Sequence, residues 1–167
     1  MTDTSEIFRL WRSSLPFDEI SLGIGGIRLA KVDEITAFQV GYSVSAAGAS
    51  FCTGQSGDWK PHWLAIGYET CLGDPIVLDT SATPPHVLTA MHGAGEWDAI
   101  EIATSLAGFE VALVEVKQLS NGRENPVALE ENPIPPTERV AALSKIEAAN
   151  PGIDMQFWEL QLGSGDE

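Results

Sequence analysis

Three short apolar runs in the middle of the chain, each bounded by turn residues, constrain the fold more than any other feature. The runs cover residues 63–67, 75–79 and about 86–88, and Gly73-Asp74 is a turn signal between the first two. Short apolar runs with this punctuation are typical of β-strands. From about 97 to 117, apolar residues instead recur every three or four positions, as on the core-facing side of a helix. The sequence therefore predicts an α+β domain with a central, mostly antiparallel sheet flanked by helices.

Helical periodicity also appears near both ends of the chain. Ile7, Leu10 and Trp11 share one face of a predicted helix over residues 3–13. Gly108 lies inside the predicted 97–117 helix, where glycine costs about 1 kcal/mol relative to alanine, so it requires a packing reason. The other elements are predicted from periodicity, caps and turn residues: short helices over 17–20 and 29–41, a loop over 43–61, an exposed connector over 120–136, a helix over 137–149, a strand over 155–162, and a frayed end over 163–167.

The charge of the chain restricts its partners. Nine basic and 24 acidic residues give a formal net charge of −15 at pH 7, which is large for 167 residues. Such a field repels nucleic acid and anionic membranes and favours basic partners, although it also simply promotes solubility. The N-terminus lacks the apolar core of a signal peptide, and no run reaches the roughly 18 apolar residues of a membrane span. We therefore expect a cytoplasmic protein that binds neither nucleic acid nor membranes.

No set of residues has the spacing of a known catalytic or metal site. Cys52 and Cys71 lack the close pairing of zinc ligands, and the nearest histidines, His86 and His92, are six positions apart. The glycines after His92 are similar to the oxyanion loop of a lipase, but the chain lacks the G-x-S-x-G motif that carries the nucleophilic serine of such enzymes. We therefore expect these glycines to turn the chain into the predicted 97–117 helix. The sequence predicts no enzymatic activity, no cofactor and no metal.

Several short motifs follow one another in a distinctive order. They are Leu15-Pro16 before an acidic residue, W-x-x-I-G from Trp63, G-D-P-I-x-L-D from Gly73, P-x-V from Pro85, H-G from His92 and I-A-x-S-L-x-x-F from Ile102. This order resembles the SUKH superfamily, which contains the Smi/Knr-type cell-wall regulators and many bacterial immunity proteins. The resemblance implies one SUKH-like domain over residues 1–167, with a core motif at 15–113 and an extended C-terminal helix and strand at 137–162.

The resemblance also implies a protein-binding module without chemistry of its own. The most concrete form is an immunity-type protein that occludes a basic toxin domain by steric and electrostatic means. A regulatory scaffold of the cell-wall or signalling type is the alternative, and a small-molecule binder or an undetected enzyme is a third hypothesis. Gene neighbourhood separates the first two, because a toxin gene beside this one favours immunity.

Four residues on loops that end the sheet are the predicted partner contacts. Trp59 is expected to be exposed in a polar loop, where an acidic setting suits a binding hot spot; a tryptophan folded onto the sheet is the alternative. The side chain of Asp74, the turn residue before Pro75, is also expected to accept hydrogen bonds from backbone donors. Trp63 and Trp97 are expected in the core, each with a bonded indole N–H. The predicted contacts are Asp58, Trp59, Glu69 and Asp74.

Overall fold

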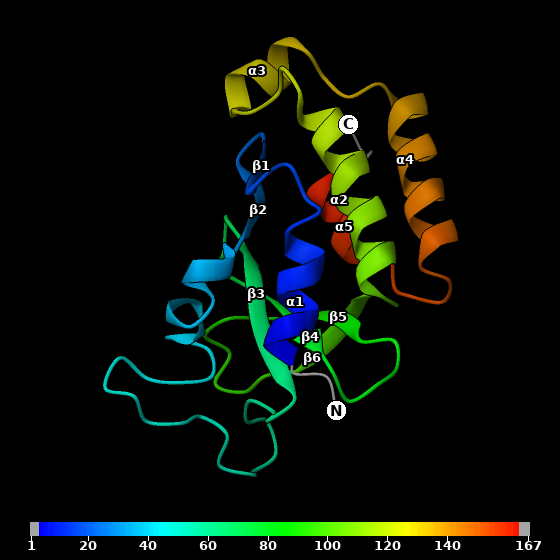
Figure 1. The fold of residues 1–167 in the computed structure, drawn as a ribbon. Helices are drawn as coiled ribbons and strands as arrows, with labels where there is room; N and C mark the ends of the chain where they lie inside the picture. The colour runs from blue at the N-terminus through cyan, green and yellow to red at the C-terminus, as the bar shows by residue number, and fades with distance from the viewer. Residues whose placement is uncertain (1–3, 164–167) are drawn as a thin grey trace.

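A six-stranded antiparallel sheet lies at the centre of the computed structural model, which describes residues 4–163 (Figure 1). Each strand pairs with the next one along the chain, so the sheet is a simple meander. This confirms the predicted α+β class with a central antiparallel sheet. The strands are β1 Glu19–Leu22, β2 Gly25–Leu29, β3 Trp63–Glu69, β4 Pro75–Asp79, β5 His86–Ala90 and β6 Ala99–Ala103.

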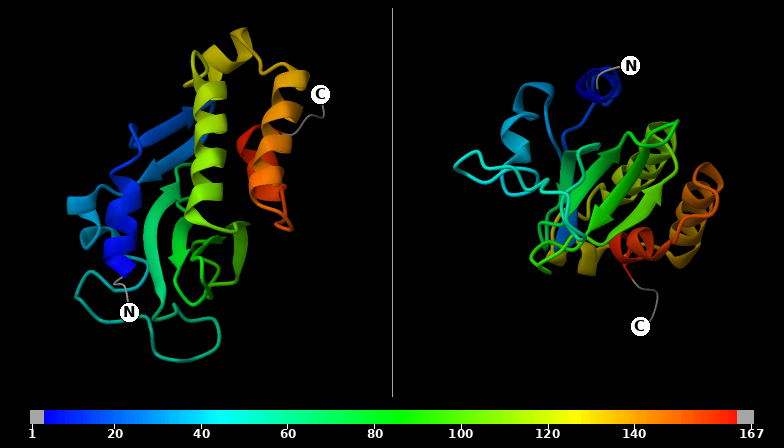
Figure 2. Two further views of the ribbon diagram at one scale, coloured as in Figure 1. Left: turned by 45° about the vertical axis from the view of Figure 1, so that its right-hand side comes forward. Right: turned by 90° about the horizontal axis from the view of Figure 1, so that it is seen from below.

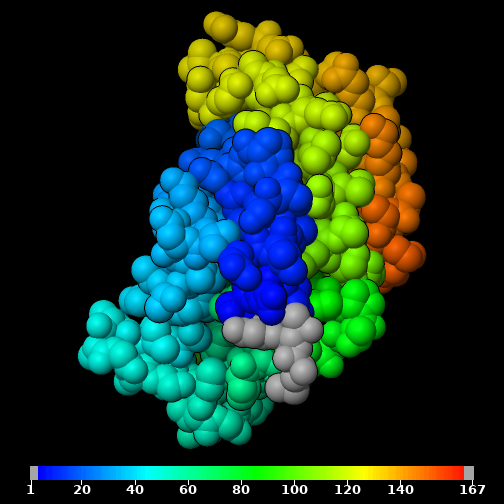
Figure 3. Space-filling view, in the orientation of Figure 1, coloured from blue at the N-terminus to red at the C-terminus, as the bar shows by residue number. Residues whose placement is uncertain are grey.

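Helices cover one face of this sheet. The long helix α2 packs against β1 and β6, and α4 packs on α2 (Figure 2). The segment that joins β2 to β3 begins beside α1 with a 3-10 turn, and Ile35 and Phe38 in this first part pack against the main core. Its later part, which contributes Tyr42, Cys52 and Trp59 to the opposite face of the sheet, lies at the lower end of the molecule in Figure 3. The helices are α1 Thr4–Arg12, α2 Leu106–Ser120, α3 Pro126–Glu131, α4 Pro136–Ala149 and α5 Gln156–Gln161, with two 3-10 helices, η1 Val32–Glu34 and η2 Ala37–Gln39. No helix within residues 4–163 has the length and apolar character to cross a membrane.

Each face of the sheet has its own hydrophobic cluster. Side chains alternate along a strand, so Ile76 and Leu78 enter the main core beneath the helices while Val77 faces the other way. The main core runs from Phe8 in α1 to Leu162 after α5, which makes residues 4–163 one α+β unit. The smaller cluster lies under the segment between β2 and β3 and is built from Trp59, Ala65, Val77 and Leu88, with Tyr42, Cys52, Trp63, Trp97 and Ala99 packed around them.

Two helices predicted in the N-terminal part are wrong or incomplete. The predicted helix over 17–20 is replaced by β1, in which Ile20 and Leu22 are buried on alternate positions. A tight turn with Gly23 in the left-handed region (φ +61°) then starts β2, so the local pattern has period two. The predicted helix over 29–41 reduces to the end of β2 and two 3-10 turns, whereas the segment 43–61 is a loop as predicted.

The predicted helix over 97–117 begins too early. Its first part is strand β6, and Ile102 is a buried strand residue rather than part of the helical stripe. The glycines after His92 therefore lead into a further strand. The strand ends at Ala103, and Ser105 caps α2, because its hydroxyl accepts a hydrogen bond from the Gly108 backbone N–H at 3.0 Å.

The C-terminal part differs from the prediction in two places. The connector 120–136 contains helix α3, and Arg123 within it is buried. The predicted strand over 155–162 is helix α5 instead, because Phe157 and Trp158 are both buried, and consecutive residues of a strand would face opposite sides. The predicted helix over 137–149 is confirmed as α4. The predicted fraying falls mainly on 164–167, outside the described residues.

Candidate functional site

Trp59 is buried, so the expected exposure is wrong and the alternative, a tryptophan folded onto the sheet, is confirmed. Its side chain is 1% exposed, and its indole N–H donates to the Trp63 carbonyl at 3.1 Å. The rings of Trp63 and Trp97 pack edge-on against it, with centroids 5.5 and 5.3 Å away, and Tyr42 stacks at 6.0 Å. The second face of the sheet presents apolar side chains such as Val77, and burying this tryptophan there removes them from water.

The two flanking tryptophans are only partly in the core. Trp63 and Trp97 are half-buried members of the second cluster. The indole N–H of Trp63 is buried and lacks a hydrogen-bond partner among residues 4–163, so the expected bond is absent there. These rings therefore act as a cover over the sheet rather than as a polar site.

Asp58 shapes the loop beside this aromatic cluster. Its carboxylate accepts hydrogen bonds from the Thr53 hydroxyl and from the backbone N–H groups of Thr53 and Gln55, the latter two at 3.1 Å. These hydrogen bonds lower the pKa of the Asp58 carboxyl from its usual value, and the bond from the Thr53 hydroxyl makes the largest contribution. The side chain therefore braces the loop, and its charge is only partly exposed.

Glu69 and Asp74 hold the β3–β4 turn (residues 70–74) in place. The two carboxylate oxygens of Glu69 accept the backbone N–H groups of Cys71 and Leu72, each at 2.7 Å, and the side chain is only 7% exposed. Glu69 is therefore a turn brace whose side chain is largely buried, and what remains accessible of it lines a groove beside this turn. Asp74 accepts the His92 backbone N–H at 2.7 Å, which confirms its predicted role as a cap for backbone donors.

An apolar groove of about 490 Å³ lies beside this braced turn. Its walls come from the β1–β2 turn (residues 23–24), the β3–β4 turn, α3 with the residues after it, and α5. Three of its apolar side chains are highly exposed: Ile24 at 79%, Leu72 at 70% and Leu160 at 67%. The apolar wall consists of Leu22, Ile24, Leu72, Leu129, Ile134, Phe157, Leu160 and Leu162, and Cys71 also lines it.

The meander explains why these side chains meet. Successive antiparallel strands place alternate turns at the same end of the sheet, so the β1–β2, β3–β4 and β5–β6 turns share one end. Each of these turns carries an exposed apolar residue: Ile24, Leu72 and Met91. Turn positions are usually polar or glycine. The apolar side chains in turns were thus a sequence signal for this surface, which our sequence analysis missed.

The groove has an acidic setting. The segments that line it, residues 22–26, 69–74, 126–134 and 157–163, contain no lysine or arginine. One cation reaches its end from α4, where the Arg139 guanidinium donates to the Gly163 carbonyl. Five carboxylates lie on the lining segments: Glu69 and Asp74 line the groove itself, and Glu130, Glu131 and Glu159 are exposed neighbours in the sequence of its lining residues.

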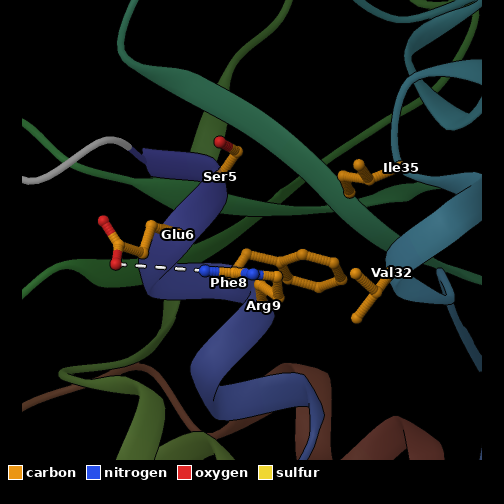
Figure 4. Close-up of a pocket in the computed structure, with 6 residues that line it drawn as sticks. All are labelled: Ser5, Glu6, Phe8, Arg9, Val32 and Ile35. Atoms are coloured by element: carbon orange, nitrogen blue, oxygen red, sulfur yellow. Dashed lines mark ion pairs between the residues drawn. The ribbon is translucent and has the colours of Figure 1, made fainter.

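A second hollow, of about 370 Å³, lies between α1 and η1 (Figure 4). The Arg9–Glu6 ion pair, at 4.0 Å, lies along α1 at its edge, and Phe8 points toward Val32. Ser5 and Ile35 complete the lining. Three of the six residues that line this hollow are polar or charged, whereas the apolar groove carries several exposed apolar side chains.

Two of the three histidines pair with carboxylates, and both lie towards the other end of the sheet. His62 lies 3.6 Å from Asp79, and His86 lies 2.9 Å from Glu101. Asp79 and His86 are also opposite each other on β4 and β5. Within residues 4–163, no three or more His, Cys, Asp or Glu side chains are grouped so that they could hold a metal ion.

Tyr42 provides a titration test of the aromatic cluster. Burial, with smaller contributions from Tyr68 and Asp74, raises the pKa of its phenol to about 12. The pKa of Tyr42 in the folded protein therefore exceeds the value of about 10 that it has in the unfolded chain. Its contribution to the free energy of unfolding is complete below about pH 10 and is lost as the pH rises towards 12. The chain has two tyrosines, so Tyr68→Phe leaves Tyr42 alone. In a pH titration of this variant, we expect the tyrosinate absorbance of the folded protein to appear at a clearly higher pH than that of the same variant unfolded in urea. If the two titrations have the same midpoint pH, the burial of Tyr42 is contradicted.

Comparisons with known proteins give no relative for this chain. No protein-family model, no curated protein and no solved structure matches it.

Proposed function

We propose that this protein is a non-enzymatic binding module of the immunity type, which neutralises a basic toxin domain by covering its functional surface. The observation that carries the proposal is the apolar groove, whose lining segments bear carboxylates and no lysine or arginine. Exposed apolar side chains beside acidic charge are suited to a basic protein partner. The order of motifs along residues 15–113, which resembles the SUKH superfamily, supports the same proposal.

The distribution of charge adds to this argument. The chain has nine basic and 24 acidic residues, and five of the nine basic side chains have a carboxylate within 4.0 Å. Much of the positive charge is therefore neutralised locally, and the field around the molecule is that of the remaining carboxylates. The five paired basic residues are Arg9, Arg12, Arg28, Lys31 and Lys145.

The proposed mechanism has an electrostatic step and an apolar step. The negative field attracts the basic toxin surface and speeds association, and apolar contacts then slow dissociation. The bound protein excludes the toxin's own substrate by its bulk. A regulatory scaffold would use the same surface, but its partner would keep its activity when bound.

The proposal is tested with a purified basic toxin domain encoded beside the gene for this protein. We expect one such domain to bind and to lose its toxic activity in the complex. The affinity should fall by about tenfold or more between low and high salt, because screening weakens the long-range attraction. Isothermal titration calorimetry measures the affinity, and an activity assay of the toxin reports neutralisation.

Two outcomes would contradict this proposal in different ways. Binding without loss of toxin activity would favour the scaffold. Failure of every neighbouring basic domain to bind at low salt would reject the immunity function itself.

A further inference from the structure

We propose that the apolar groove is the docking site for a basic amphipathic helix of the partner protein. The apolar face of that helix would contact Ile24, Leu72 and Leu160, while its lysine or arginine side chains would face the surrounding carboxylates. The inference rests on the proposed function, since it assigns the surface and the kind of partner segment through which binding occurs.

The exposed apolar surface is the first argument. Single exposed apolar side chains are common on proteins, but a contiguous group beside a groove marks an interaction site. Ile24, Leu72 and Leu160 are each at least 67% exposed and come from three separate elements around one groove of about 490 Å³. A helix whose apolar residues recur every three or four positions presents a row of side chains that suits such a groove.

Charge decides which partner fits. The lining segments carry five carboxylates and no lysine or arginine, and the protein as a whole has a charge of −15. A second copy of this chain would bring the same negative charges together, which costs free energy. A basic helix instead pairs its cations with the exposed carboxylates of Glu130, Glu131 and Glu159 while its apolar face is buried.

The walls of the groove are held in place before binding. Glu69 braces the β3–β4 turn through its two 2.7 Å hydrogen bonds, and a Cβ on Gly25 would lie 3.4 Å from its Oε1, so the two turns sit close together. Arg123 fixes the α3 side by donating to the carbonyls of Asn132 at 2.7 Å and Leu119 at 2.9 Å. A preformed groove loses little conformational entropy on binding, which favours affinity.

The test uses a synthetic helical peptide of leucine and lysine as the probe, with its leucines spaced every three and four positions. A second peptide of the same composition, but with a scrambled order, controls for simple charge attraction. The protein variants are Leu160→Arg in the groove and Leu10→Arg on α1, since Leu10 is 65% exposed and both changes add one positive charge. Binding is followed by amide chemical shifts and by calorimetry at moderate salt.

We expect the ordered peptide to bind at least about tenfold more tightly than the scrambled one, with shifts at residues 22–25, 71–74 and 157–163. Leu160→Arg should abolish this preference, and Leu10→Arg should keep it. Equal binding of the two peptides, or equal effects of the two variants, would overturn the proposal. So would a dimer of the wild-type protein that Leu160→Arg alone dissociates, because the occupant would then be a second copy.

This design separates the inference from the proposed function. If the groove binds the ordered peptide but no neighbouring toxin domain binds, the function fails and the groove assignment stands. If a toxin domain binds equally well to Leu160→Arg and Leu10→Arg, the function stands and the groove assignment fails.

Discussion

Replacing Trp158 by alanine is expected to lower the free energy of unfolding by about 3–5 kcal/mol, the range found for deletion of a large buried aromatic side chain. Trp158 is fully buried, and its ring packs against Phe157 at 4.9 Å and Phe109 at 6.0 Å. Its indole N–H donates to the Ile102 carbonyl on β6 at 2.8 Å. The alanine variant therefore loses packing between α5, α2 and the sheet, and it leaves a buried carbonyl without its donor.

Urea denaturation measures this loss in the free energy of unfolding. Two further variants separate the contribution of the indole N–H from that of the buried ring. Trp158→Phe keeps a ring but loses the N–H, so we expect a smaller loss of about 1–3 kcal/mol. Leu160→Ala lies on the same helix at a 67% exposed position and should change stability by less than about 0.5 kcal/mol. A Trp158→Ala variant as stable as Leu160→Ala would contradict the role of α5 in the core.

Replacing Gly108 by alanine is expected to destabilise the protein by about 2–4 kcal/mol, although alanine is the better helix former by about 1 kcal/mol. An added Cβ would lie 2.1 Å from Asn150 Oδ1 and 2.8 Å from the Ala149 carbonyl oxygen. Asn150 is fully buried, accepts the Thr104 backbone N–H and donates to the Gly108 and Ile146 carbonyls. The methyl group would push this side chain away and break the junction between α2, α4 and β6.

A neighbouring position supplies the control for this prediction. Ala107 is exposed on the same helix, so Ala107→Gly changes only the helix propensity and should cost about 1 kcal/mol or less. The double variant Gly108→Ala with Asn150→Ala should lose less than the sum of the two single changes, because both disturb one junction. Thermal unfolding that shows Gly108→Ala to be more stable than the wild type would reject the steric argument.

The glycine also illustrates what a sequence pattern can predict. Inside a helical stripe, Gly108 required a packing reason, and the buried Asn150 provides it. The strands over 63–69, 75–79 and 86–90 and the helices over 4–12 and 136–149 follow their predicted positions to within a few residues. These segments have strong periodicity or clear boundaries, so local chemistry suffices to define them.

Short segments with mixed signals were predicted less well. Residues 19–20, 99–103 and 156–161 lie in segments that were predicted as the wrong type of element, the first of them in the predicted helix over 17–20. The elements found there are four to six residues long, so one or two apolar positions satisfy both a helical and a strand period. In each case the neighbour decides: β1 pairs with β2, β6 pairs with β5, and α5 lays two consecutive aromatic residues on the main core.

Four properties of this protein follow from its sequence alone: the α+β class, the order of the central strands, the strong negative charge and the need for space at Gly108. These properties depend on local periodicity and on composition, which any conformation of the chain retains. The packing of the folded chain, by contrast, buries Trp59, makes Glu69 a brace of the β3–β4 turn, and gathers Ile24, Leu72 and Leu160 around one groove. The physical reason is that burial and proximity depend on which distant segments pack together, and in this protein the antiparallel meander brings distant turns to one end of the sheet.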